Sequence, residues 1–124
     1  PMRVTFETLR DDYPVNLDAL KIEHVLLAFV GTDQSAVEID VGLRYTPEGQ
    51  RASVGGRARP DGGVISTRRG NAGSWAALIG RSPVGVWELE LPDTEEMRRR
   101  FTQEDIVDLL LVVSYVGRLP AWPD

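Results

Sequence analysis

The nine residues 85–93, GVWELELPD, decide how we interpret the fold of this chain. Trp87 and the leucines that follow it alternate with Glu88 and Glu90, which is the period of a β-strand with one face in the core. The proline and aspartate at the end of the segment stop the strand, because proline brings no N–H to a β-ladder and aspartate favours a turn or a helix cap. The segment therefore predicts an amphipathic strand that buries Trp87.

Residues 109–116, LLLVVSYV, are the most apolar run in the chain, and their β-branched side chains favour a strand. We predict that this second strand is fully buried. A charged stretch separates the two strands, and at its start Asp93 is placed to cap a helical turn that Glu96 closes from the third position. Met97 and Phe101 lie four residues apart on one face of that turn. One or two short helical turns are therefore expected between the two strands.

Shorter patterns predict the rest of a β-rich fold. Alternating or continuous apolar residues predict strands at residues 2–7, 21–30, 37–45, 51–59, 64–67 and 75–79. Residues 25–30 are apolar on both faces, as expected for a strand in the middle of a sandwich. The turn PDGG at 60–63 suggests that the strand after it pairs back across residues 51–59 as a hairpin. The predicted fold is mainly β: a two-sheet antiparallel β-sandwich, jelly-roll or immunoglobulin-like, with one or two short helical turns.

Length and composition restrict the classes of function. The 124 residues suffice for a single domain with one core. A net charge of −5 argues against nucleic acid as the main partner, and the lack of cysteine excludes thiol chemistry and thiolate metal sites. No apolar run is long enough for a membrane span, and no signal peptide is visible at the start. Because the chain begins at Pro1 and enters a strand almost at once, we expect it to be a piece of a longer protein.

Few residues suggest catalysis or metal binding. His24 is the single histidine and has no partner for a triad or a multi-histidine metal site, so a structural role is expected. Glu88 and Glu90 share one strand face and would suit a glycosidase pair or a calcium site, but such residues are common on solvated strand faces. Asp11 and Asp12 are interpreted as a turn. We predict no catalytic residue, no metal and no cofactor.

Tryptophans and arginines are the better candidates for binding. Trp75 follows a flexible stretch, where it is either an exposed platform for a sugar or, more often for such residues, a packing side chain. Trp122 either packs the chain end onto the fold or marks a domain boundary. The arginines of residues 51–70 form a positive segment, either a solvated hairpin or a surface for an acidic partner. On charge and loop position, the candidate protein-binding residues are Arg68, Arg69, Arg81 and Trp75.

The order of these segments resembles a known family, the C-terminal domain of the A component of bacterial Tc insecticidal toxin complexes, which binds the B component. DYP at 12–14 with the following LKIEHV is similar to the family's turn and its lysine-bearing strand. Residues 31–43 are similar to its glycine turn and next strand. Residues 85–92 and 105–115 are similar to its "WxLxLP" strand and its terminal strand. Residues 46–82 match the family only loosely.

The resemblance implies a non-catalytic role. A domain of this family would be a β-sandwich at the end of a very long secreted toxin subunit that forms a pentamer around a translocation channel. It would dock the propeller of the B component, and with it the B–C cocoon, over the channel entrance, with no membrane insertion of its own. The expected function is therefore assembly of a toxin complex. A carbohydrate-binding β-sandwich is the alternative, and it requires exposed aromatics such as Trp75 or Trp122.

Overall fold

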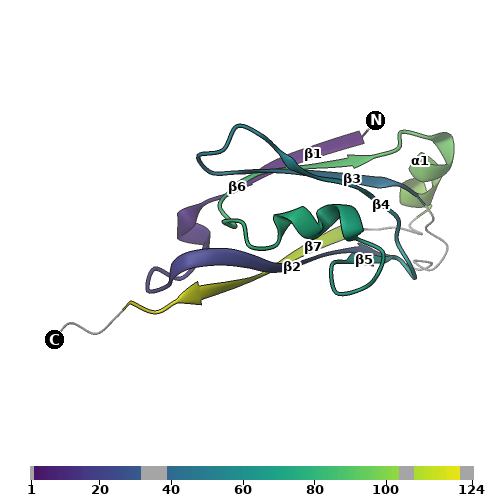
Figure 1. Ribbon diagram of the computed structural model, residues 1–124. Helices are drawn as coiled ribbons and strands as arrows, with labels where there is room; N and C mark the ends of the chain where they lie inside the picture. The colour runs from purple at the N-terminus through teal and green to yellow at the C-terminus, as the bar shows by residue number, and fades with distance from the viewer. Residues whose placement is uncertain (1, 32–38, 104–107, 121–124) are drawn as a thin grey trace.

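The computed structural model describes residues 2–31, 39–103 and 108–120, and it consists of two antiparallel sheets packed face to face (Figure 1). The four-stranded sheet has the order β1-β6-β3-β4, and the three-stranded sheet has the order β5-β2-β7. The strands are β1 (Met2–Thr8), β2 (Asp18–Val30), β3 (Val41–Pro47), β4 (Val54–Ala58), β5 (Val64–Ser66), β6 (Gly85–Leu91) and β7 (Asp108–Arg118). The predicted two-sheet β-sandwich is confirmed.

Strand β6 lies in the interior of its sheet and has the amphipathic character expected from its sequence. Trp87 lies opposite Phe6 of β1 and Tyr45 of β3, and it is fully buried. Its ring centroid lies 6.1 Å from that of Phe6 and 4.0 Å from that of Tyr45. The indole Nε1 donates a hydrogen bond of 2.9 Å to Oγ1 of Thr8. Trp87 therefore joins three strands of one sheet to the core.

Strand β3 supplies the second amphipathic face of the core. Val41, Leu43 and Tyr45 point inward and are fully buried, while Gly42 and Arg44 lie on the outer face, as the alternation predicts. Of the predicted strand 37–45, residues 37 and 38 lie outside the described part of the chain. The inward rows of the two sheets meet in one cluster that includes Ile22, Val25, Leu27, Phe29, Leu43, Tyr45, Trp87 and Leu89.

The segment around Trp75 is a 3₁₀ helix, η3 (Gly73–Leu78), so the strand predicted at 75–79 is wrong. A short apolar run does not by itself distinguish a strand from a helical turn. Trp75 is fully buried, and its Nε1 donates a hydrogen bond of 3.0 Å to the carbonyl oxygen of Gly56 in β4. In Figure 1, η3 lies between the two sheets, where it closes one side of the sandwich.

The turn at 60–63 is present, but the hairpin predicted from it is wrong. Asp61 and Val64 exchange two backbone hydrogen bonds of 2.9 and 3.2 Å around Gly62 and Gly63, whose φ angles are 60° and 78°. Pairing stops there, because β5 pairs with β2 of the other sheet instead of with β4. The turn carries the chain from one sheet to the other, and Ile65 enters the core from the second sheet.

Strand β7 is an edge strand and is not fully buried, which corrects the sequence prediction. Leu109, Leu111 and Val113 pack against the core, whereas Leu110 and Val112 on the opposite face are 52% and 41% exposed. A two-layer sandwich buries only one face of each sheet, so a strand that is apolar on both faces leaves one of them in solvent.

The helical turn predicted after β6 is confirmed as α1 (Glu95–Thr102), with Met97 buried beneath it. Its cap lies one residue later than predicted. Oγ1 of Thr94 accepts a hydrogen bond of 3.2 Å from the N–H of Met97, while Asp93 forms an ion pair of 2.8 Å with Arg98. A hydroxyl in place of the predicted carboxylate therefore begins the helix.

The DYP turn at residues 12–14 lies in the connection between β1 and β2, where it contacts both the loop before β6 and strand β7. It follows the 3₁₀ turn η1 (Arg10–Asp12), in which Asp12 Oδ2 accepts a hydrogen bond of 2.7 Å from the N–H of Leu9. The hydroxyl of Tyr13 donates a hydrogen bond of 2.8 Å to the carbonyl of Pro83, and its ring packs edge-to-face on Tyr115 at 4.8 Å. These contacts fasten the loop before β6 to β7.

Candidate functional site

The outer face of the three-stranded sheet is apolar where residues 26–29 of β2 pair with residues 109–112 of β7, and it becomes polar further along, where Ser114 lies opposite His24. Ala28 of β2 lies opposite Leu110 of β7, and Leu26 lies opposite Val112. We call this surface the apolar face, and its outward side chains are Leu26, Ala28, Val30, Leu110, Val112 and Val116. Leu110, Val112 and Val116 are 52%, 41% and 46% exposed. Exposed apolar side chains that gather on one sheet face can mark a protein–protein or membrane interaction site or a ligand-binding groove.

One edge of this sheet also lacks a strand partner. Within residues 2–31, 39–103 and 108–120, β7 pairs with β2 alone, so its second edge carries no ladder. The opposite side of β2 is closed by β5 and further along by a backbone pair, in which the N–H of Ile22 donates to Arg81 and the N–H of Gly80 donates to Ile22 at 2.7 and 2.8 Å. An edge strand of eleven residues that is apolar from Leu109 to Val113 is a template for a further strand.

The structure separates the predicted binding residues. Arg68 and Arg69 lie in the exposed turn after β5, and Arg68 forms an ion pair of 3.7 Å with Glu23 of β2. Arg81 is exposed and donates a hydrogen bond of 3.3 Å to the carbonyl of Ala77. The three arginines therefore lie along the closed side of β2.

Trp75 is different from the three arginines, because it is fully buried. It presents no ring surface to a partner or to a sugar, and its place among the candidate binding residues is corrected accordingly. In the structure Trp75 has a packing role, which is the more frequent role for such residues. Trp122, the other candidate aromatic, lies outside the described residues.

The positive segment does not form one basic surface. Arg57 and Arg59 belong to β4 and the turn after it, on the four-stranded sheet, whereas Arg68 follows β5 on the other sheet. Arg59 forms an ion pair of 2.9 Å with Asp40. Because the chain crosses between sheets at 60–63, arginines that are close in sequence are divided between two surfaces.

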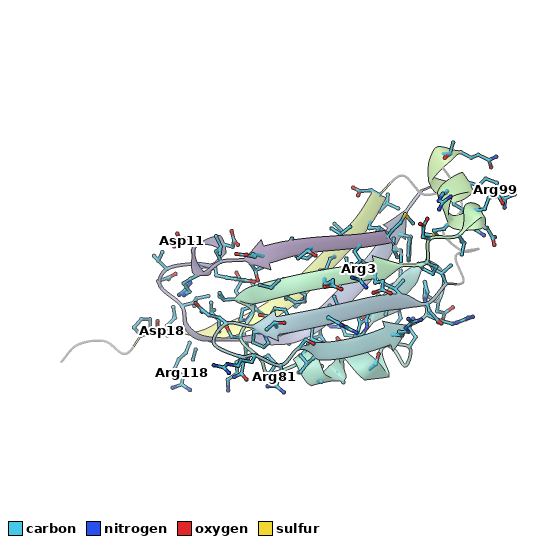
Figure 2. The ribbon with its side chains drawn as sticks, turned by 90° about the horizontal axis from the view of Figure 1, so that it is seen from above. Arg3, Asp11, Asp18, Arg81, Arg99 and Arg118 are labelled. Atoms are coloured by element: carbon cyan, nitrogen blue, oxygen red, sulfur yellow. The ribbon has the colours of Figure 1, made fainter. Side chains whose placement is uncertain are left out.

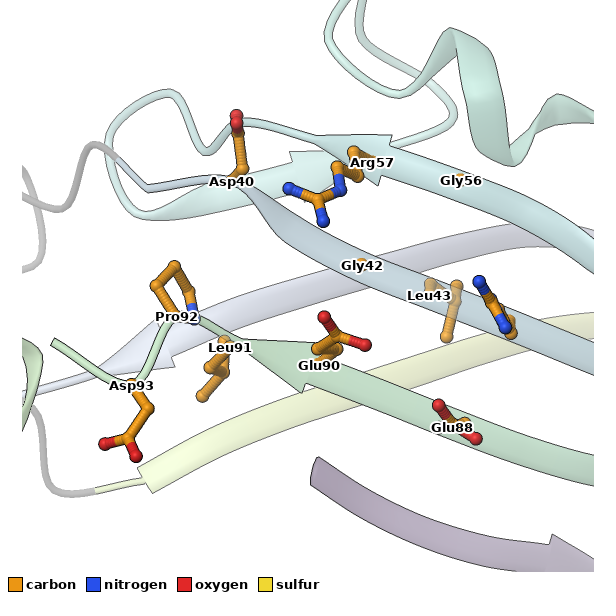
Figure 3. Close-up of a pocket in the computed structure, with 11 residues that line it drawn as sticks. Asp40, Gly42, Leu43, Gly56, Arg57, Glu88, Glu90, Leu91, Pro92 and Asp93 are labelled. Atoms are coloured by element: carbon orange, nitrogen blue, oxygen red, sulfur yellow. The ribbon is translucent and has the colours of Figure 1, made fainter. Parts of the chain in front are cut away.

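The outer face of the four-stranded sheet carries a hollow that sequence reasoning missed (Figure 3). Its volume is about 440 Å³. Strands β3, β4 and β6 and the turn after β6 line it, through Asp40, Gly42, Arg44, Arg57, Glu88, Glu90 and Asp93. Glu88 and Glu90 face outward, as their alternation predicts, and both border the hollow. The one signal in the sequence was Gly42, because glycine in the interior of a strand often marks a close approach.

The carboxylates and the arginines of the hollow differ in their partners. Glu88 and Glu90 both lie near Nε of Arg3, at 3.7 and 3.4 Å. Asp40 and Asp93 are likewise ion-paired, with Arg59 and Arg98. Among the described residues, no carboxylate lies within 4 Å of Arg44 or Arg57. The hollow therefore contains neutralised acids and two guanidinium groups with unused donors.

Other chemistry-bearing groups are held in structural contacts. Nδ1 of His24 lies 3.2 Å from Oγ1 of Thr67. Burial raises the pKa of both Tyr13 and Tyr45 above the ordinary value, and their hydroxyls donate to the backbone carbonyls of Pro83 and Ser82. The described residues include no group of three or more metal-ligating side chains. None of their helices is both long and apolar enough for a membrane crossing.

No family model matches this chain, and the comparisons with curated proteins and with solved structures give no match either.

Proposed function

We propose that this protein is a non-catalytic protein-binding module and that its docking surface is the apolar face together with the free edge of β7. The supporting observation is the exposure of Leu110, Val112 and Val116 on one sheet face. Covering apolar surface contributes about 25 cal/mol per Å². A partner that covers these side chains therefore gains affinity from the most apolar segment of the chain.

The geometry favours docking by strand addition. A partner strand beside β7 would complete the unused N–H and C=O groups of its edge, and its side chains would extend the apolar row over Leu110 and Val112. Main-chain hydrogen bonds would supply affinity, while the apolar contacts would select the register.

For the partner we propose the B component of a Tc-type toxin, with the cocoon docked over the channel of a secreted pentameric parent. This proposal is supported by the resemblance between the order of segments in this chain and their order in the toxin family. Three of the segments that resemble the family can be placed in the fold. Residues 12–14 form the turn that holds Tyr13, residues 85–92 include β6, and the segment 105–115 includes most of β7. The proposed docking strand thus belongs to one of the resembling segments.

The test is binding of the B component from the same genome to matched variants of this chain. Val112 and Val86 are 41% and 40% exposed, on the outer faces of opposite sheets. Val112→Glu is expected to weaken binding at least ~10-fold, because it places a charge in the docking surface, while Val86→Glu changes binding less than ~2-fold. Unfolding curves confirm that both variants fold.

Two outcomes would contradict the proposal at different levels. Equal binding by the two variants would exclude the apolar face as the docking surface. Failure of the folded wild type to bind the B component, both alone and as a pentameric fusion, would exclude the toxin role. The pentameric arm is needed because a contact that depends on several copies is weak in the monomer.

The arginines beside β2 are expected to act on the association rate. Exchanging Arg68 and Arg69 for glutamate reverses the charge beside the apolar face and should slow association several-fold with little change in dissociation. The control is Arg99→Glu, a charge reversal in α1, which follows β6 of the other sheet and lies in Figure 2 at the opposite end of the molecule from Asp18 and Arg118. Unchanged association in the double variant would remove these arginines from the docking surface.

A further inference from the structure

We propose that the hollow on the four-stranded sheet binds a small polyhydroxylated carboxylic acid of the sugar-acid class. Arg44 and Arg57 would hold the carboxylate, and Glu88 and Glu90 would accept hydrogen bonds from the hydroxyl groups. This site lies on the opposite outer face from the docking surface, so it does not depend on the proposed function.

The floor of the hollow is made by Gly42, and neither the backbone nor the packing requires a glycine there. Gly42 is not among the residues with a positive φ. A Cβ at this position would lie 3.4 Å from the Cβ of Glu90, which is ordinary van der Waals contact. Glycine weakens the interior of a strand, because it orders a flexible backbone without adding a side chain that packs. The remaining physical role of Gly42 is to leave the floor of the hollow open.

Gly55 shows what a required glycine looks like on the same face. Its φ is 131°, and a Cβ there would lie 2.0 Å from the carbonyl oxygen of Leu43, so only glycine fits. It lies opposite Arg44, in the next outward row after the pair of Gly42 with Arg57. The two glycines therefore have different roles. The backbone conformation requires a glycine at position 55, whereas Gly42 leaves the space above its strand open.

The register places opposite charges on the two sides of Gly42. Arg57 of β4 and Glu90 of β6 are its direct neighbours across the sheet. In Figure 3 their side chains lie on either side of Gly42 and leave the strand bare between them. Arg44 is the diagonal neighbour of Arg57 on the same face, and Glu88 lies opposite Arg44. Arg44 and Arg57 thus face Glu88 and Glu90 across the hollow, and Asp40 lies beside Arg57 and is paired with Arg59.

This arrangement selects the chemistry of the ligand. Guanidinium groups bind carboxylates through paired, charge-assisted N–H donors, and those of Arg44 and Arg57 have no carboxylate partner among the described residues. Glu88 and Glu90 share Arg3, which leaves most of their acceptor sites unused, and hydroxyl groups fill such sites. None of the described residues that line the hollow is aromatic, so a neutral sugar would lack a stacking surface among them. Its 440 Å³ lies within the size range of small-molecule pockets.

The test is titration of the protein with glucuronate, followed by backbone amide chemical shifts. Glucuronate is expected to bind at millimolar concentration and to shift the amides of β3, β4 and β6, whereas glucose binds at least ~10-fold more weakly because it lacks the carboxylate. Glutarate, an acid without hydroxyl groups, should also bind more weakly than glucuronate. Shifts that are equal for glucose, or the absence of glucuronate binding, would overturn the proposal.

Two variants separate a ligand site from a structural feature. Arg44→Gln with Arg57→Gln should weaken glucuronate binding at least ~10-fold, because both charged donors are lost. Gly42→Thr should abolish binding by filling the floor, while its thermal midpoint stays the same or rises, because threonine favours a strand. Retained binding in either variant would overturn the site. A large fall in the midpoint of Gly42→Thr would show that the glycine is structural and would overturn the proposal as well.

Discussion

The two outer faces of this sandwich follow different rules although the sheets share one core. The outward positions of the four-stranded sheet are mostly polar, so its outer face carries charged side chains such as Glu88 and Glu90, held by Arg3, with Val86 as an exposed exception. Strands β2 and β7 are apolar on both faces at residues 26–30 and 109–113, so Leu110 and Val112 face solvent. Alternation identifies the face that enters the core. A continuous apolar run in a two-layer fold indicates a second apolar surface, which the described residues leave exposed.

The largest expected effect tests this difference with the same substitution on each sheet. Leu89→Ala in β6 removes a buried side chain and should lower the free energy of unfolding by about 2–5 kcal/mol. Leu110→Ala in β7 removes a side chain that is 52% exposed and should cost less than about 1 kcal/mol. Urea unfolding of both variants measures the contrast. Comparable losses would mean that the outer face of β7 is covered in solution.

The sequence predicted the amphipathic strands because their period reports on a single surface. In residues 41–47 and 85–91 apolar side chains recur at every second position, and Val41, Leu43, Tyr45, Trp87, Leu89 and Leu91 enter the core. The partner of a strand is not encoded in this way. Residues 64–66 pair with β2 rather than with β4. In this position Ile65 enters the core from the three-stranded sheet.

The hollow was beyond prediction for a related reason. Gly42, Arg57 and Glu90 come from three strands, and only the register of β3 with β4 and β6 brings them into one row. The exposure of β7 escaped prediction because an apolar run has the same pattern in a buried strand and at an unpartnered edge.

A second effect concerns the tyrosines that close one end of the sandwich. Burial raises the pKa of Tyr45 and of Tyr13 above the ordinary value of about 10, so the folded state holds these protons more tightly than the unfolded state. The resulting stability is fully present below pH ~10 and is lost as the pH rises through the folded-state values. For each tyrosine, the free energy of unfolding should fall by about 1.4 kcal/mol per pH unit in that window.

Denaturation at increasing alkaline pH tests this expectation, and Tyr45→Phe is the matched variant. It keeps the ring against Trp87 but lacks the ionisable hydroxyl, so its stability should depend less steeply on pH. An equally steep alkaline loss in the variant would assign the effect to other groups.

A smaller effect is expected from the ion pairs on the outer face of the four-stranded sheet, which we call the polar face. Arg59→Ala removes the pair with Asp40, whose two side chains are largely solvent-exposed, and should lower the free energy of unfolding by about 0.2–1 kcal/mol. The cost should shrink as salt is added, because salt screens exposed charges. Thermal unfolding at low and high ionic strength measures both. A loss that is independent of salt would point to packing of the arginine stem instead of to its charge.

The smallest effect tests the apolar face most directly. Val112→Thr keeps the shape of the side chain and its preference for a strand but adds a hydroxyl, which water can solvate on an open surface. The free energy of unfolding should therefore change by less than about 0.5 kcal/mol. Val86→Thr, of equal exposure on the polar face, is the control and should behave alike. If the chain itself covered Val112, the new hydroxyl would lack a partner and the same substitution would cost about 1–3 kcal/mol. A near-neutral result in stability, together with weaker binding of an apolar dye by Val112→Thr alone, would establish that this face is free for a partner.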